Sequence, residues 1–344
     1  MFTPRYTITE TLLSAIKRIN VLVAQLNTKH FSHTILLQFE KDARALSSFA
    51  STSIEGNPLP LTDVKRILKS HPRHLRGSEQ EVLNYNQALE ALNAKLKKGP
   101  VQFNGNLILG IQRTVVKNLV PANLEGQLRT DAVFVNDPRT GHTVYWPPDA
   151  TGVMPLMDAL LQFVKGKRGA IDPIILAGLF HKQFVLIHPF MDGNGRTARL
   201  ATKVLLAELG LDTFPLFSFE AYYNANVTRY FQFVGERGNY YDLFDSIDFT
   251  PWLEYFAEGI VDELLRVQKE LTKHLVTPER ELKPYHQKII VTIKKNGYIR
   301  DPDYARLTTR AKATRNLDFK LLLTLGLIAR KGKGKATYYV LKTE

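Results

Sequence analysis

A glycine-rich stretch between His188 and Arg199 holds the side chains of this sequence that are best suited to chemistry. It reads HPFMDGNGRTAR. A histidine can act as a general base near neutral pH, and the carboxylate of Asp192 is an oxygen ligand of the kind that Mg²⁺ prefers. Arg196 and Arg199 are three residues apart, so they lie on one face of a helix. A base, a metal-binding carboxylate and paired cations together indicate phosphoryl or nucleotidyl transfer.

The backbone around these side chains is predicted to form an anion-binding turn. Pro189 disfavours continuation of the preceding helix past His188, and Gly193 and Gly195 allow backbone conformations that other residues avoid. A helix is expected to begin near Gly195 and to run to Leu209. Free N–H groups at its start, together with the helix dipole, attract anions. Two arginines at this end are repelled by the positive end of the helix dipole. Their presence therefore favours a polyphosphate bound between them.

Composition limits the class of protein and its compartment. The chain has 344 residues, 44% of them hydrophobic, which suggests two domains with a sizeable core. It has no cysteine, so disulfides, cysteine zinc sites and thiol catalysis are excluded. The N-terminus lacks an apolar run of signal-peptide length, and no stretch approaches the roughly 20 apolar residues of a membrane span. We therefore expect a soluble, cytoplasmic protein with no membrane partner.

Most of the chain has the apolar spacing of α-helices. The exception is the segment 132–146, where two short β-prone runs flank a turn rich in Asp, Pro and Gly, the pattern of a β-hairpin. Helices are expected at 9–26, 33–49, 62–68, 80–96, 153–164, 173–186, 195–209, 227–233 and 252–275. The predicted fold class is mainly α with one β-hairpin.

The C-terminal segment 283–344 follows a linker and differs in charge from the rest of the chain. It contains 15 Lys plus Arg against 4 Asp plus Glu, a net +11 of the total +13. Its pattern predicts helices at 285–295, 301–307 and 309–325 and strands at 327–330 and 337–341, with a lysine-rich turn between the strands. Three helices followed by a hairpin are the layout of a winged helix.

A basic winged helix favours a nucleic-acid partner, and DNA is the first candidate. Arg310, Lys312 and Arg315 are expected early on its third helix, where cations neutralise phosphates in helix-turn-helix proteins. Two alternatives remain, a solvated lysine-rich surface and a domain that mediates protein contacts.

The stretch from His188 to Arg199 resembles the signature of the Fic family at every fixed position: histidine, proline, phenylalanine, any residue, aspartate, glycine, asparagine, glycine, arginine, two free positions and arginine. The helix before it and the hairpin are similar as well, and the likeness covers roughly residues 35 to 275. The resemblance implies a Fic helical core with a β-hairpin flap. It divides the chain into an N-terminal helical region 1–100, a catalytic core 101–275 and a winged-helix-like domain 283–344.

The same resemblance implies a protein adenylyltransferase, which transfers AMP from ATP to a Tyr, Thr or Ser hydroxyl of a target protein. His188 would take the proton from that hydroxyl, and Asp192 would bind Mg²⁺. The phosphates would be held by Gly193, Asn194, Gly195, Arg196 and Arg199. The intact Gly-Asn-Gly sequence favours AMP transfer over the phosphorylation performed by the Doc subgroup. An adenine pocket is implied at Tyr230, Phe231 and Asn239, although a core role suits the aromatic pair equally well.

The sequence STSIEGN from Ser51 to Asn57 fits an inhibitory pattern of one Fic subgroup, in which this segment precedes the catalytic motif. Its glutamate, Glu55, can form a bidentate pair with Arg199 and so remove the partner of the γ-phosphate. Ser51, Glu55 and Gly56 are the predicted inhibitory residues. The alternative is an ordinary capping or surface role for Glu55.

The resemblance also implies partners. The hairpin would bind a segment of the target protein by strand addition, and a homodimer would control release of the inhibitory segment. Three other functions remain open: removal of AMP from a modified target at the same site, use of another nucleotide donor, and a nucleotide-sensing DNA-binding regulator.

Overall fold

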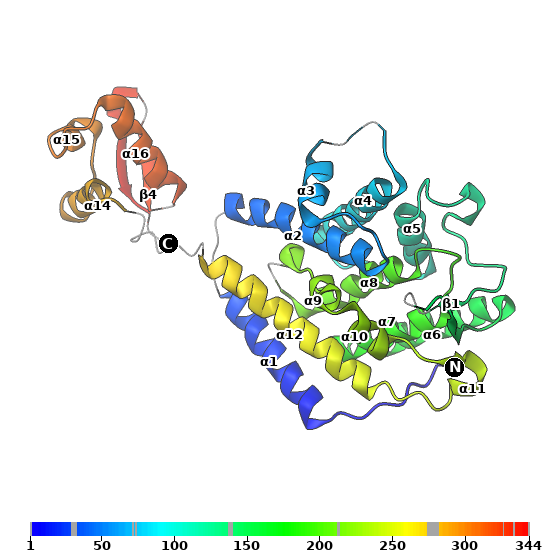
Figure 1. The fold of residues 1–344 in the computed structure, drawn as a ribbon. Helices are drawn as coiled ribbons and strands as arrows, with labels where there is room; N and C mark the ends of the chain where they lie inside the picture. The colour runs from blue at the N-terminus through cyan, green and yellow to red at the C-terminus, as the bar shows by residue number, and fades with distance from the viewer. Residues whose placement is uncertain are drawn as a thin grey trace. The chain divides into compact units, whose positions relative to one another are not determined.

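The computed structural model describes residues 2–28, 33–70, 72, 74–136, 140–211, 214–273, 282–325, 327–332 and 334–342. The chain forms two compact units, Met1–Gln268 and Lys269–Glu344 (Figure 1). Both are mainly helical, so the predicted fold class is confirmed. Among the described residues, no helix combines the length and the apolar character needed to cross a membrane.

The larger unit contains the helices that were predicted and three that were not, α5, α9 and α11. Its helix α2 continues five residues past the predicted end, so most of the predicted inhibitory segment is helical. The helices are α1 (Glu10–Asn27), α2 (His33–Ile54), α3 (Leu61–Ser70), α4 (Gly77–Lys98), α5 (Gly105–Val115), α6 (Ala150–Lys167), α7 (Pro173–Ile187), α8 (Asn194–Leu206), α9 (Glu220–Ala225), α10 (Val227–Val234), α11 (Tyr240–Leu243) and α12 (Thr250–Lys273).

Helices α7 and α8 form the centre of this unit. Every residue of α7 except Pro173 and Val185 is buried, as expected for a helix that is apolar all round. In α8 only Gly195 is not fully buried. The two helices pack on each other, and α5 and α4 pack on α8 while α6 packs on α7 (Figure 1). The turn between α7 and α8, which carries the signature, is therefore held between two buried helices.

The predicted hairpin is confirmed. Strands β1 (Val135–Asn136) and β2 (Thr143–Trp146) pair antiparallel, and the three turn residues 137–139 lie outside the described part of the chain. A third strand, β3 (Gly238–Asn239), pairs in parallel with β2. Two residues are too few to show an alternating pattern, so β3 could not be predicted from the sequence.

The smaller unit has the element order expected for a winged helix. It consists of α14 (Pro284–Asn296), α15 (Asp301–Ala305), α16 (Lys312–Thr324), β4 (Ile328–Lys331) and β5 (Tyr338–Leu341), and the two strands pair antiparallel. Its core includes Ile289, Tyr304, Phe319 and Leu322. Helix α16 begins three residues later than predicted, so Arg310 precedes the helix. Most of the predicted linker, 277–284, lies outside the described residues.

Candidate active site

The candidate base, His188, stands at the end of α7. Its backbone is left-handed, with φ 51° and ψ 59°, and its N–H donates to Phe184 O at 3.1 Å. The ring Nδ1 lies 3.2 Å from Val185 O. A carbonyl can only accept, so Nδ1 carries the hydrogen and Nε2 has the free lone pair. Burial lowers the pKa of His188, which keeps the imidazole neutral and able to accept a proton.

The glycine-rich turn after His188 is closed by Asn194. Its Oδ1 accepts from Phe190 N at 2.9 Å, and its Nδ2 donates to Phe190 O at 2.8 Å. Gly193 is left-handed with φ 82°, and a Cβ there would lie 2.7 Å from Val116 Cγ1, so only glycine fits. The N–H groups of the first turn of α8 precede the helical hydrogen-bond ladder. This helix start has the backbone geometry that the sequence predicts for an anion-binding turn, and its binding of an anion stays a prediction.

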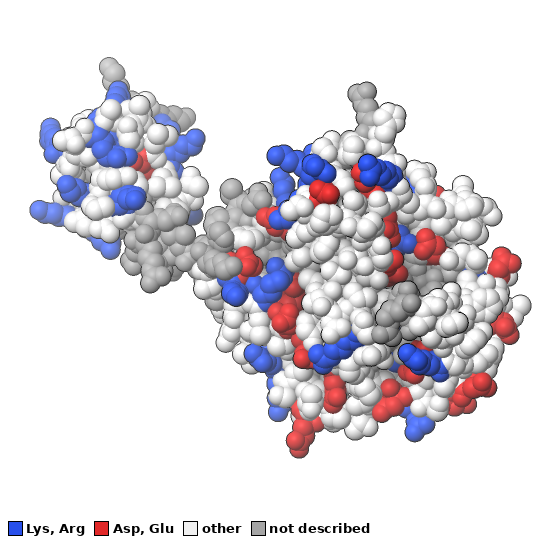
Figure 2. Space-filling model, viewed as in Figure 1, with Lys and Arg blue, Asp and Glu red and all other residues white. Residues whose placement is uncertain are grey.

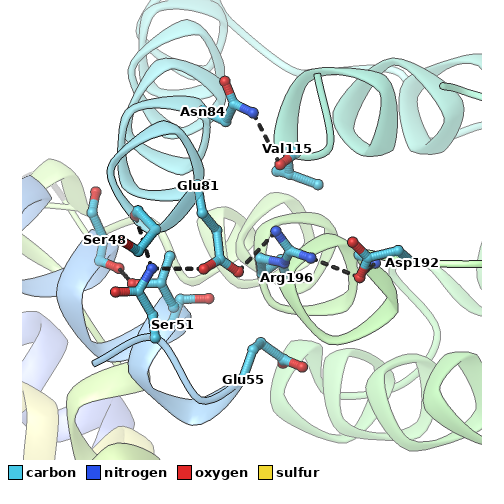
Figure 3. Close-up of polar contacts among 12 residues, drawn as sticks. Ser48, Ser51, Glu55, Glu81, Asn84, Val115, Asp192 and Arg196 are labelled. Atoms are coloured by element: carbon cyan, nitrogen blue, oxygen red, sulfur yellow. Dashed lines mark hydrogen bonds and ion pairs between the residues drawn. The ribbon is translucent and has the colours of Figure 1, made fainter. Parts of the chain in front are cut away.

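The first arginine of the signature, Arg196, lies between two carboxylates. Its Nη2 is 2.8 Å from Asp192 Oδ1, and its Nη1 is 2.9 Å from Glu81 Oε1 on α4 (Figure 3). Among the described residues, Nε and Nη1 are buried without a hydrogen-bond partner of good geometry. The guanidinium therefore has donors available for a ligand oxygen.

The second arginine, Arg199, is fully buried and is held by the end of α2. Its Nε donates to Ser51 Oγ at 2.7 Å, and its Nη2 donates to Ser51 O at 2.9 Å and to Glu55 Oε1 at 2.6 Å. The expected pair with Glu55 is thus present, but it runs through one carboxylate oxygen instead of two. In the described part of the chain Nη1 of Arg199 has no hydrogen-bond partner.

The carboxylate of Glu55 also covers the start of α8. A Cβ on Gly195 would lie 2.1 Å from Glu55 Oε1, so the carboxylate sits directly against the helix N-terminus. Gly56, with φ 93°, makes the turn that ends α2 just after it. The glutamate therefore occupies the place where the helix would receive an anion.

Comparison with known proteins agrees with this geometry. Residues 102–206 match the model of the Fic/DOC family. The matched segment, which includes the signature turn from His188 to Arg199, is a Fic/DOC-family domain. The chain is 31% identical over 187 residues to "Protein adenylyltransferase fic-1" of Caenorhabditis elegans, covering 53% of this chain and 35% of that protein. It is 32% identical over 174 residues to "Protein adenylyltransferase Fic" of Nematostella vectensis, covering 49% and 39%. The chain thus spans less than half the length of these curated relatives.

Solved structures confirm the Fic fold. A Fic family protein from Desulfovibrio desulfuricans G20 has a TM-score of 0.66 at 20% identity and covers 100% of this chain and 99% of that chain. Fic-1 of C. elegans has a TM-score of 0.59 at 24% identity and covers 76% and 73%.

Arg129, in the Fic/DOC-matched segment, was not predicted as a site residue from the sequence. Its side chain is buried. Its backbone N donates to Pro189 O at 2.9 Å and its Nε to His188 O at 2.8 Å. The same guanidinium donates to Asp131 O at 3.0 Å and to Pro148 O, at the two ends of the flap. Arg129 therefore fixes the flap to the loop that carries the candidate base.

Arg129→Ala is expected to lower the free energy of unfolding by about 2–4 kcal/mol, because it leaves several buried carbonyls without donors. Urea denaturation followed by circular dichroism measures this. The matched control is Arg66→Ala, since Arg66 is 74% exposed and pairs with Asp63 one turn earlier. The control should change stability by less than about 0.5 kcal/mol. Equal stability of the two variants would contradict a clamping role for Arg129.

The structure does not gather the three residues of the predicted adenine pocket around one cavity. Tyr230 is buried, its hydroxyl lies 3.0 Å from His181 Nε2, and its ring stacks on Tyr223. Phe231, by contrast, is 40% exposed. Asn239 caps α11 and lies in a shallow pocket beside the flap. The contacts of Tyr230 are those of a core residue, and the nucleoside-binding role of all three remains a prediction.

The residues of the turn fit a nucleotide with Mg²⁺. The described part of the chain holds no cluster of three or more His, Cys, Asp or Glu suited to a metal ion. The one carboxylate of the signature, Asp192, is 47% exposed. Mg²⁺ commonly takes one or two carboxylates and completes its shell with phosphate oxygens and waters. The unpartnered guanidinium nitrogens of Arg196 and Arg199 supply the matching phosphate donors.

Proposed function

We propose that this protein is a protein adenylyltransferase that transfers AMP from ATP to a hydroxyl group of a target protein. The observation that carries the proposal is the position of His188, whose Nδ1 contacts Val185 O, in the same turn as Asp192 and directly before the helix start that holds two arginines. Curated relatives that match about half of this chain are named protein adenylyltransferases.

In this mechanism His188 Nε2 takes the proton of the target hydroxyl as its oxygen attacks the α-phosphorus. A new P–O bond to the target forms, the bond between the α- and β-phosphates breaks, and pyrophosphate leaves. The first turn of α8 and the two arginines hold the phosphates. Asp192 would hold Mg²⁺, which would neutralise phosphate charge when bound. The contribution of the protein is therefore positioning and charge stabilisation.

The wild-type protein is proposed to be autoinhibited by Glu55. Its carboxylate lies against the start of α8 and pairs with Arg199. A terminal phosphate at the same place would lose its arginine and meet a like charge. ATP would then bind in a position from which its α-phosphate does not face His188.

The target is proposed to bind along β1. The sheet order is β1-β2-β3, so β1 is an edge strand whose backbone groups can pair with an extended segment. Phe134, just before β1, and Trp146, at the end of β2, are 57% and 40% exposed and line a pocket that also includes Tyr241. They offer an apolar contact for side chains of the target segment.

A comparison of labelled nucleotides tests the reaction. Glu55→Gly protein is incubated with Mg²⁺ and ATP labelled at either the α- or the γ-phosphate, with labelled UTP in parallel, and protein-bound label is measured. AMP transfer predicts label from α-labelled ATP alone. Label from the γ-phosphate would show phosphorylation instead, and preferential label from UTP would show a different donor.

A second function, binding of duplex DNA by the smaller unit, is favoured by the distribution of its charges. Three carboxylates of its described part make contacts inside the unit. Asp318 pairs with Arg310, Asp301 pairs with Arg315 at 2.8 Å, and Asp303 accepts from Arg300 N. The visible surface of this unit is accordingly dominated by Lys and Arg (Figure 2).

These ion pairs correct part of the sequence-based expectation. Arg310 and Arg315 were expected to contact phosphates, and the structure shows that both form ion pairs with aspartates of the same unit. The exposed face of α16 instead presents Lys312, Asn316 and Lys320 at four-residue spacing. We propose this face as the DNA contact, because lysines bind phosphates and an asparagine can read adenine in the major groove.

Lys312→Glu/Lys320→Glu is expected to weaken binding of a fluorescent duplex by more than about tenfold and to reduce the salt slope by about 2, since two phosphate contacts are lost. Fluorescence anisotropy at several salt concentrations measures both. The matched control is Lys165→Glu/Lys167→Glu, two exposed lysines at the end of α6 in the larger unit. Equal loss in both double variants, or no binding by wild type at low salt, would contradict the DNA proposal.

A further inference from the structure

Glu81 on α4 is an acidic residue beside the phosphate-binding turn that has no part in the reaction described above. Its Oε1 lies 2.9 Å from Arg196 Nη1, and its side chain is 16% exposed. The other carboxylate on this guanidinium, Asp192, is 47% exposed. Arg196 thus pairs with one carboxylate that is largely buried and with one that is half exposed. A buried guanidinium needs a counterion at all times, because an unpaired charge at such a site is strongly unfavourable.

The second oxygen of Glu81 faces the inhibitory segment. Asn57 Nδ2 donates to Glu81 Oε2 at 2.7 Å and to Ser78 O at 2.9 Å. Asn57 is two residues from Glu55, and its backbone N donates to Thr52 O at 3.1 Å, which closes the end of α2. One carboxylate therefore touches both the first signature arginine and the turn that carries the proposed inhibitory glutamate.

The two carboxylates on Arg196 are suited to different tasks. Asp192 is open and belongs to the turn, so it can leave the guanidinium for a metal ion. The carboxylate of Glu81 is held by both Arg196 and Asn57, so it stays in contact with the guanidinium. Burial raises the pKa of Glu81, whereas Arg196 and Asn57 act in the opposite direction. The enclosed carboxylate and the enclosed guanidinium thus stabilise each other's charged forms.

We propose that Glu81 is a positioning residue that holds the Arg196 guanidinium in place for the terminal phosphates of ATP, and that Asn57 couples this carboxylate to the inhibitory turn. The inference rests on the proposed nucleotide binding and deepens it. Without the charge of Glu81, Arg196 keeps Asp192 as its one carboxylate partner in the described part of the chain. It then competes with the metal for Asp192 and turns away from the phosphates.

The inference is tested by measuring the binding of Mg-ATP and of AMP by calorimetry. The two proteins compared are Glu55→Gly and Glu55→Gly/Glu81→Gln. The Kd for Mg-ATP is expected to rise about tenfold or more, because a charge-assisted contact that orders Arg196 is lost. The Kd for AMP is expected to change less than twofold, since AMP lacks the β- and γ-phosphates. The control Glu90→Gln removes a carboxylate from the same helix that pairs with Arg44 and should change neither value.

A double-mutant cycle separates positioning from a general structural effect. Once Arg196→Gln is present, adding Glu81→Gln should change the Kd for Mg-ATP by less than twofold, because its effect acts through Arg196. The inference would be overturned if Glu81→Gln weakened the binding of ATP and AMP equally, or left the affinity for ATP unchanged. Additive effects of Glu81→Gln and Arg196→Gln on the Kd for Mg-ATP would also overturn it. These measurements do not depend on transfer, so failure to label a target would count against the proposed reaction alone. Glu55→Gly protein that binds neither nucleotide would overturn both.

Discussion

Glu55→Gly is expected to raise the initial rate of AMP transfer by at least about tenfold, since removal of one carboxylate relieves two obstacles. It frees Nη2 of Arg199 from its 2.6 Å contact, and it clears the space directly over Gly195 at the start of α8. The γ-phosphate then has an arginine partner and no like charge beside it. The rate is measured as covalent label from α-labelled ATP with Mg²⁺, on the protein itself and on candidate targets.

Glu55→Gln provides the matched control for this prediction. Glutamine fills the same space and can still contact Arg199, but it carries no charge. Its rate is expected to lie between those of wild type and Glu55→Gly, which separates the contribution of charge from that of space. A Glu55→Gly variant that is no more active than wild type in every assay would exclude the autoinhibitory role.

His188→Ala is expected to reduce transfer by about 10²–10⁴-fold in the Glu55→Gly background, the usual contribution of a general base. The contact of Nδ1 with Val185 O at 3.2 Å leaves Nε2 as the proton acceptor. His74→Ala is the matched control, because His74 is an exposed histidine of the same unit outside the signature turn. The control should retain the full rate. Comparable label on His188→Ala would show that another group removes the proton.

The same histidine gives the reaction a defined pH dependence. The pKa of His188 is lowered by burial, so the neutral, active form persists to lower pH than that of an unperturbed histidine. The value of kcat/KM is therefore expected to be constant around neutral pH and to fall only on the acid side, as pH drops through this lowered pKa. A rate that rises steadily from pH 6 to 8 would contradict a neutral base.

The sequence was sufficient to predict the groups that lie close together along the chain. The turn from His188 to Arg199 is one local structure, and its glycines and Pro189 determine where α7 ends and α8 begins. The pair of Glu55 with Arg199 was predictable from a short pattern. The end of α2 was not, because Ser51 and Thr52 form a last helical turn that packing stabilises and local propensity does not.

The residues that support the site could not be predicted, for a physical reason. Arg129 and Glu81 are ordinary charged residues in the sequence, and their roles depend on partners 59 and 115 positions away, His188 and Arg196. In the smaller unit the sequence likewise does not show that Arg310 and Arg315 form ion pairs with Asp318 and Asp301. Spacing along a chain reveals local periodicity and turns, but it does not show which charges the tertiary structure neutralises.

The most direct test of the proposed adenylyltransferase activity is one labelling experiment with Mg²⁺ and α-labelled ATP. It compares wild type, Glu55→Gly and Glu55→Gly/His188→Ala, with covalent label measured on the protein and on added candidate targets. We predict strong label with Glu55→Gly, weak label with wild type and none above background with the double variant. Label of equal strength with Glu55→Gly and with the double variant, or no label with any of the three, would contradict an AMP transferase that uses His188 and is inhibited by Glu55.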